Sequence, residues 1–145
     1  MKKIARRDFM KSSIAAGFAL AMPFSRVRGA NNDIRAAVVG FRGHGRTHIN
    51  AYLKIPDVRV VALCDADSDI LSRGVSESKG RNQKVDAYTD VRALLDDNSI
   101  DVVSTATPNH WHALVTIWAC QAGKDVCVEK PVSHNIFEEI GRAHV

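Results

Sequence analysis

Short apolar runs alternate with longer mixed segments from Ile34 onward, and this alternation constrains the fold more than any other feature of the chain. The apolar runs are nearly continuous and rich in valine, isoleucine and alanine, which is typical of strands buried on both faces of a parallel sheet. Expected strands cover residues 34–39, 58–63, 85–88, 100–105 and 125–128, and expected helices cover 47–54, 68–79, 91–96 and 111–121. This order predicts an α/β fold with a doubly wound parallel sheet.

The first expected strand runs directly into a glycine-rich turn, Gly40-Phe41-Arg42-Gly43-His44-Gly45, and a helix follows. Glycine lets the chain turn sharply and brings backbone N–H groups, together with the positive end of the helix, close to a pyrophosphate. With a strand before it and a helix after it, the turn indicates a Rossmann-like dinucleotide-binding domain. All six residues of the turn are therefore candidate cofactor-binding residues. A glycine turn that binds nothing is the alternative.

Asp65 ends the second expected strand. A carboxylate at this place can accept hydrogen bonds from the adenosine ribose hydroxyls, and it repels a 2′-phosphate. NAD is therefore favoured over NADP as the cofactor. Arg42 keeps NADP open, because a guanidinium in the turn can pair with that phosphate.

Polar side chains also follow the fourth and fifth expected strands, at the edge where open parallel sheets bind ligands. Thr107-Pro108-Asn109 and His112 follow the fourth strand, and Glu129-Lys130-Pro131 follows the fifth. We expect these segments to lie side by side, near the nicotinamide end of a bound dinucleotide. His110 and His112 point apart if they open a helix, so no metal site is predicted from them.

Together, the glycine-rich turn, the segment ATPNHWHA and the segment VEKP resemble the Gfo/Idh/MocA oxidoreductase family over residues 34–139. The resemblance implies a two-domain enzyme with a nicotinamide cofactor and a sugar, polyol or related substrate. It implies that Lys130 is catalytic and lies near the nicotinamide and the substrate, and that a cis bond precedes Pro131. The other residues that it places in the cofactor-binding cleft are Thr107, Pro108, Asn109, His112 and Glu129. The family's catalytic histidine comes from the second domain.

Two other functions stay open beside the nicotinamide-dependent oxidoreductase. Some proteins of this fold hold NAD tightly, oxidise a sugar transiently, eliminate the glycosidic bond and then reverse the oxidation. An NAD-dependent glycosidase is therefore the first alternative. A non-catalytic nucleotide- or sugar-binding protein is the second.

Residues 1–30 have the layout of a signal peptide, with a basic start, an apolar stretch and a polar, small-residue end. The segment Arg6-Arg7-Asp8-Phe9-Met10-Lys11 resembles the twin-arginine export signal. We therefore expect a periplasmic or otherwise exported protein that engages the twin-arginine machinery and has no stable membrane anchor. An ordinary secretory signal is the alternative. Export in the folded state suits a protein that must first acquire a cofactor in the cytoplasm.

The net charge of +4 does not indicate nucleic-acid binding, because the leader carries it. Residues 1–30 contain seven Lys or Arg residues and one acid, whereas residues 31–145 contain 13 Lys or Arg residues and 15 acids. The body therefore has no basic surplus for a phosphate backbone, and no nucleic-acid partner is expected.

Two expectations concern the core. Cys64, Cys120 and Cys127 all lie in apolar runs, so we expect three small buried side chains rather than a disulfide framework. In the helix over 111–121, helical spacing predicts one buried apolar face. The residues of that face are Trp111, Leu114, Val115, Trp118 and Ala119.

The C-terminal residues of the sequence indicate that the nucleotide-binding domain is incomplete. The nucleotide-binding domain is expected over residues 31–139, incomplete at its C-terminal end and without the second, α+β substrate domain. Residues 140–145 fit the preceding helix poorly and equal the translation of a common sequencing-adapter string, so we expect a non-native tail. On this interpretation the 145-residue chain is inactive by itself, and a homo-oligomer stays open for the full-length protein.

Overall fold

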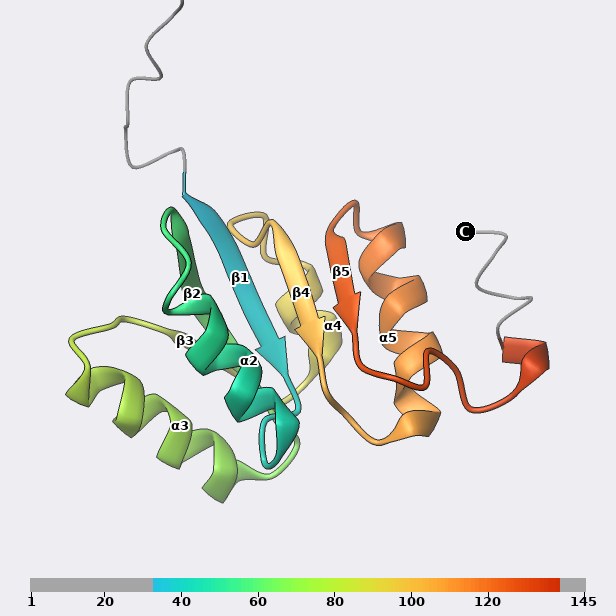
Figure 1. The fold of residues 1–145 in the computed structure, drawn as a ribbon, viewed down its shortest axis with the longest axis horizontal. Coiled ribbons are helices and arrows are strands. Elements are labelled where there is room, and N and C mark those ends of the chain that lie inside the picture. Colours follow the sequence, from blue (N-terminus) through green and yellow to red (C-terminus); the bar gives the residue numbers. More distant parts are fainter. Residues whose placement is uncertain (1–32, 139–145) are drawn as a thin grey trace, which may run out of the picture. The chain divides into compact units, whose positions relative to one another are not determined.

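The computed structural model describes residues 33–138 of the chain. The expected leader (1–30) and the expected tail (140–145) both lie outside these residues. Within them, five strands form one parallel sheet in the order β3-β2-β1-β4-β5 (Figure 1). The strands are β1 (Ile34–Val39), β2 (Val58–Cys64), β3 (Asp86–Tyr88), β4 (Val102–Thr105) and β5 (Asp125–Val128).

The strand order makes the sheet doubly wound. The chain starts at β1, moves outward through β2 to β3, and then crosses to β4 and β5 on the other side of β1. The connections are helices α2 (His44–Tyr52), α3 (Ser68–Gly80), α4 (Val91–Leu95) and α5 (Asn109–Gln121). The predicted Rossmann-like α/β fold is therefore confirmed. The winding reverses between β1 and β4, which is where sheets of this kind bind ligands.

Alternate residues of β1 enter two hydrophobic cores on opposite faces of the sheet. Val39 packs with Leu94 of α4 and Ala119 of α5 on one face. Val38 packs with Ile70 of α3 on the other. Figure 1 shows α2 in front of the sheet and α4 behind it. Burial on both faces explains why β1 reads as an uninterrupted apolar run.

The strands were predicted to be buried on both faces, and this expectation is wrong for the two edges of the sheet. In β1 and β2 most residues are buried, whereas β5 alternates between exposed and half-buried residues and β3 has no buried residue. An edge strand has a neighbour on one side only, and the helices cover the edges less completely than the centre.

Three elements begin two or three residues away from their predicted starts. Helix α2 begins at His44, inside the glycine motif, rather than at residue 47. Strand β4 begins at Val102, because Ile100 lies in a turn where its N–H donates to Asp97 O. Helix α5 begins at Asn109, directly after Pro108, whose φ of −58° already suits a helix start.

The buried face predicted for α5 is correct for Val115 and Ala119, with Trp118 packed against the same core, and wrong for Trp111 and Leu114. The face that the sheet covers contains His112, Val115, Thr116 and Ala119, whereas Trp111 is 41% exposed. Spacing predicted an apolar stripe, but His112 and Thr116 are buried because each makes hydrogen bonds inside the fold.

The expectation of three buried cysteines holds for Cys64 alone. Burial raises the pKa of the Cys64 thiol to about 12, so it stays protonated near neutral pH. Cys120 and Cys127 are exposed, because they lie at the end of α5 and on the edge strand β5. No disulfide joins any of the three.

None of the helices within residues 33–138 is long and apolar enough to cross a membrane.

Candidate functional site

The glycine-rich turn lies between the end of β1 and the start of α2, at the carboxyl edge of the sheet. Gly40 has a φ of +73°, a left-handed conformation that favours glycine. A Cβ added to Gly40 would lie 2.9 Å from Cγ2 of Thr107, and one added to Gly45 would lie 2.2 Å from the carbonyl oxygen of Gly40. The absence of side chains at 40 and 45 therefore lets β1, α2 and the segment after β4 approach each other.

The N-terminus of α2 has no side-chain cap. Gly43 stands at the N-cap position, and the first turn contains no acidic residue. Helices α3 and α4, by contrast, are capped by Asp67 and Asp90, whose carboxylates accept backbone N–H groups. The N–H of Arg46 donates to Gly43 O at 3.0 Å, and the amides of His44 and Gly45 are left to an outside acceptor. A Cβ added to Gly43 would meet nothing within 4 Å. This geometry suits an anion such as a pyrophosphate.

The side chains of the turn point in different directions. The Phe41 ring is 1% exposed and packs against Gly74 of α3, so only its backbone can face a ligand. Arg42 and His44 are exposed, and His44 is the first residue of α2 rather than part of a loop.

Asp65 connects the turn to the segment after β2. Its Oδ2 accepts the backbone N–H of Phe41 at 3.2 Å, and its Oδ1 accepts the N–H of Asp67 at 3.0 Å. Each carboxylate oxygen can accept a second hydrogen bond. The carboxylate is half-buried at the carboxyl end of β2, so ribose hydroxyls can still donate to it.

The segments after β4 and β5 lie side by side, as predicted. The N–H of Glu129 donates to Thr105 O at 3.1 Å, which continues the pairing of β4 with β5. His112 links the two segments further along: Nε2 lies 2.8 Å from Thr107 O and Nδ1 lies 2.6 Å from Pro131 O. Both partners are carbonyl oxygens, which only accept, so in these contacts the imidazole ring is the donor.

His112 is 1% exposed. The structure therefore places its side chain in the interior, as a link between the segments after β4 and β5. Asn109 and Pro108 are exposed at the start of α5, and Thr107 is half-buried against Gly40.

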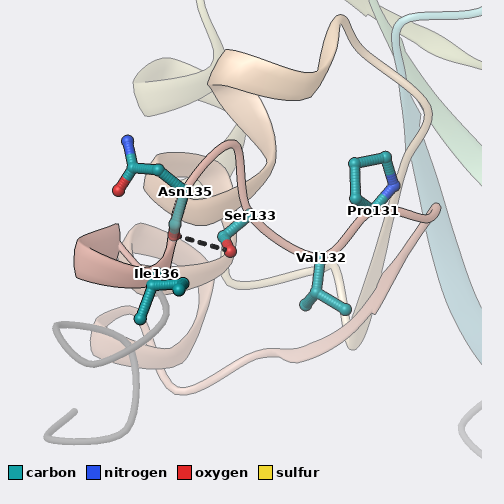
Figure 2. A pocket seen from close by; sticks show the side chains of 5 residues that line it. All are labelled: Pro131, Val132, Ser133, Asn135 and Ile136. Carbon is teal, nitrogen blue, oxygen red and sulfur yellow. Dashed lines mark hydrogen bonds between the residues drawn. The ribbon is translucent and has the colours of Figure 1, made fainter.

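Lys130 is exposed at the end of the β5 segment, and a cis peptide bond joins it to Pro131, as expected. Within residues 33–138, no carboxylate pairs with its ammonium group, which is free to contact a ligand. Figure 2 shows a pocket, the hollow that follows Lys130 in the chain, which is lined by Pro131, Val132, Ser133, Asn135 and Ile136. The Ser133 hydroxyl donates to Asn135 O at 3.1 Å and holds the turn there. None of the lining residues is charged, so the hollow does not itself attract ions.

His48 is a site residue that the sequence analysis missed. It projects from α2 and joins two segments that are distant in sequence: Nδ1 lies 2.7 Å from Ser104 Oγ, and Nε2 lies 2.8 Å from Glu129 Oε1. The hydrogen bond from His48 lowers the pKa of Glu129, and the backbone N–H of Lys130, 3.3 Å from Oε2, adds to the effect. The helix that follows the glycine turn is thereby joined to the loop that carries Lys130.

A signal for His48 exists in the sequence, although it is weak. The residue lies three positions after Gly45, on the side of α2 that turns toward the sheet. A polar residue on an inward helical face requires a polar partner. The partners come from β4 and from the end of β5, and only the folded chain brings these segments together.

Replacing His48 with alanine is expected to lower the free energy of unfolding by about 1–3 kcal/mol. The fully buried Ser104 hydroxyl loses its hydrogen bond to His48, and Glu129 loses the contact that joins it to α2. Urea unfolding of the variant measures the loss. His44→Ala is the matched control, because it removes an exposed histidine from the same helix. Equal unfolding free energies for the two variants would contradict the prediction.

Within residues 33–138, no group of three or more His, Cys, Asp or Glu side chains is placed to hold a metal ion.

Comparisons with known proteins agree with this geometry. The sequence profile of an oxidoreductase family with an NAD-binding Rossmann fold, Gfo/Idh/MocA, matches residues 34–142. A glycosyl hydrolase family 109 protein from Solibacter usitatus is 29% identical over 95% of this chain and 35% of its own length. An alpha-N-acetylgalactosaminidase from Shewanella oneidensis is 29% identical over 72% of this chain and 24% of its own length.

Among solved structures, a myo-inositol 2-dehydrogenase from Lactobacillus plantarum matches with a TM-score of 0.69 and 30% identity. The match covers 77% of this chain and 32% of that one. The chain therefore spans between a quarter and about a third of the length of these relatives.

Proposed function

The chain belongs to the Gfo/Idh/MocA oxidoreductase family and carries its NAD-binding Rossmann domain, and from this we propose that the full-length protein is a nicotinamide-dependent oxidoreductase acting on a sugar, polyol or related substrate. The observation that carries the proposal is the uncapped N-terminus of α2, with glycine at 40, 43 and 45 and the carboxylate of Asp65 beside it. The relationship to a myo-inositol 2-dehydrogenase supports the substrate class.

The described residues fit a bound nicotinamide dinucleotide. Backbone amides at the start of α2 would hold the pyrophosphate, and Asp65 would accept hydrogen bonds from the adenosine ribose. The segments after β4 and β5 would then lie beside the nicotinamide. When bound, NAD supplies a hydride acceptor for oxidation of a carbinol carbon.

Lys130 is the residue of this chain that we place closest to the reaction. Its exposed ammonium would donate a hydrogen bond to the substrate oxygen and orient the carbinol. His112 and His48 act indirectly: His112 holds the segment after β4 against Pro131, and His48 holds Glu129. The base that removes the hydroxyl proton would come from the second domain.

An NAD-dependent glycosidase is the second candidate, and the two glycosyl hydrolase relatives favour it. In this reaction a sugar carbon is oxidised, the glycosidic bond is eliminated, water adds, and the hydride returns to the sugar. The nucleotide is regenerated in each cycle. The same nucleotide site would therefore serve both functions, and the difference would lie in the substrate domain.

The full-length protein distinguishes the candidates when it is incubated with NAD and two substrate panels, free sugars or polyols and aryl glycosides. Net formation of reduced nicotinamide with a free sugar or polyol supports the oxidoreductase. Release of aglycone without net redox change supports the glycosidase. Nucleotide binding without either reaction supports a non-catalytic binding protein, and no affinity for NAD or NADP would overturn all three.

We also propose that the full-length protein is exported through the twin-arginine route, on the basis of the segment that begins at Arg6-Arg7. Replacing both arginines with lysine keeps the positive charge but removes the guanidinium pair. We expect the variant to stay in the cytoplasm, as measured by fractionation and immunoblotting. A control in which Lys2 and Lys3 become arginine should be exported normally. Unchanged export of the lysine pair would point to an ordinary secretory signal.

A further inference from the structure

Arg42 and Asp67 form an ion pair that joins the glycine-rich turn to the segment after β2. Nη2 of Arg42 lies 2.5 Å from Oδ2 of Asp67, and the arginine side chain is 74% exposed. The other carboxylate oxygen, Oδ1, accepts the N–H groups of Asp69 at 3.0 Å and Ile70 at 3.2 Å, at the start of α3. Asp67 therefore has two tasks, which are to cap α3 and to hold Arg42.

The ion pair lies beside the carboxylate that the nucleotide's adenosine ribose is expected to reach. Asp65 binds the backbone N–H of Phe41, the residue before Arg42, and also the N–H of Asp67. Two carboxylates thus lie at this end of the site, and the guanidinium of Arg42 is already paired with one of them, Asp67. A 2′-phosphate would bring further negative charge toward both carboxylates.

We propose that Asp67 is a specificity-determining residue, which favours NAD over NADP by keeping Arg42 in an ion pair. The proposal rests on nucleotide binding at the glycine-rich turn. Arginine is the side chain best suited to a phosphate group, because its planar guanidinium donates two parallel hydrogen bonds. Arg42 lies in the glycine-rich turn, and its side chain is largely exposed. The carboxylate of Asp67 is the group that pairs with its guanidinium in place of a phosphate.

The hydrogen bonds at Asp67 keep the pair charged over the working range. The backbone N–H of Ile70 is the largest cause that lowers the pKa of Asp67, and the N–H of Asp69 and the guanidinium of Arg42 add to it. The ordinary pKa of an aspartate is near 4. The lowered pKa of Asp67 therefore keeps its carboxylate ionised throughout mildly acidic and neutral pH. The preference for NAD should therefore not change between mildly acidic and neutral pH.

The test is Asp67→Ser in the full-length protein, with NAD⁺ and NADP⁺ titrated separately by calorimetry. Serine retains an N-cap oxygen for α3 but removes the charge that holds Arg42. We expect the dissociation constant for NADP⁺ to fall by about tenfold or more, the effect of one new charge-assisted hydrogen bond. The constant for NAD⁺ should change by no more than about twofold, because the 2′-hydroxyl contact at Asp65 remains. Asp67→Asn is the second variant, should the serine variant fold poorly.

Two controls separate the release of Arg42 from a general change of charge. Asp69→Ser removes the same charge from the same turn of α3, but Asp69 does not bind Arg42, so its NADP⁺ affinity should stay at the wild-type value. The double variant Asp67→Ser/Arg42→Ala should lose the gain in NADP⁺ affinity.

Four outcomes would overturn the inference. They are a wild type that prefers NADP⁺, no gain in Asp67→Ser and Asp67→Asn, an equal gain in Asp69→Ser, or a gain that persists without Arg42. If the wild type binds NAD⁺ and the ratio of the two constants does not respond to Asp67, only this inference fails. If the wild type binds neither nucleotide, the proposed function fails with it.

Discussion

Lys130→Ala is expected to lower the turnover of the full-length protein by about 10²- to 10⁴-fold, the range typical of a lost proton-transfer or polarising group. The ammonium is exposed at the carboxyl edge of β5, and no carboxylate within residues 33–138 pairs with it. The affinity for NAD should stay within about threefold, because the dinucleotide is expected to be held mainly by the α2 amides and Asp65. Steady-state kinetics and a separate NAD titration measure the two quantities.

Two variants sharpen this experiment. Lys84→Ala removes an exposed lysine from another surface and should leave turnover unchanged. Lys130→Arg keeps the charge but changes its geometry and its ability to give up a proton, so it should recover little activity. Wild-type turnover in Lys130→Ala would remove the residue from the mechanism. A loss of NAD affinity equal to the loss of turnover would reassign it to cofactor binding.

Gly45→Ala is expected to damage both the fold and the nucleotide site. A Cβ at this position would lie 2.2 Å from Gly40 O and 2.9 Å from Phe41 Cβ, so the turn or the start of α2 must move. Overpacking of this kind costs about 1–3 kcal/mol of unfolding free energy. The displaced turn can no longer align its amides, and NAD affinity should fall by at least about tenfold, the effect of one lost hydrogen bond to a charged group. Urea unfolding and NAD titration measure the two effects.

Gly80→Ala is the matched control for that substitution. Gly80 is the last residue of α3, and a Cβ there would meet nothing within 4 Å. Its NAD affinity should equal that of the wild type, and its unfolding free energy should stay the same or rise by up to about 1 kcal/mol, because alanine loses less backbone entropy on folding. A Gly45→Ala variant that behaves like Gly80→Ala would show that the turn tolerates a side chain. The proposed close packing of β1 on α2 would then be wrong.

Several features of the fold followed from local sequence. The alternating apolar runs predicted every strand and helix from β1 to β5, and the glycine-rich turn predicted where the first helix starts to within three residues. These predictions succeed because the apolar pattern and the turn residues that mark each element lie in consecutive residues. The same alternation predicted a doubly wound parallel sheet, but it did not specify the strand order β3-β2-β1-β4-β5.

The burial of individual residues was harder to predict. Trp111 was expected inside and is exposed, whereas His112 was expected on the cleft surface and is buried. Helical spacing identifies a face but does not say which polar residues find partners. The partners of His112 are carbonyls at positions 107 and 131, on two different loops.

The motifs that carry the candidate chemistry, namely the glycine turn, Asp65 and Lys130, could be recognised in the chain alone, because each depends on residue type and on its place at a strand end. The contacts that join these motifs could not be recognised in the sequence. The contacts His48–Glu129, His112–Pro131 and Arg42–Asp67 each unite residues from different connections of the sheet. Such contacts form only after distant strands have paired, so hydrogen-bond partners and the charge balance of the cleft are properties of the packed fold.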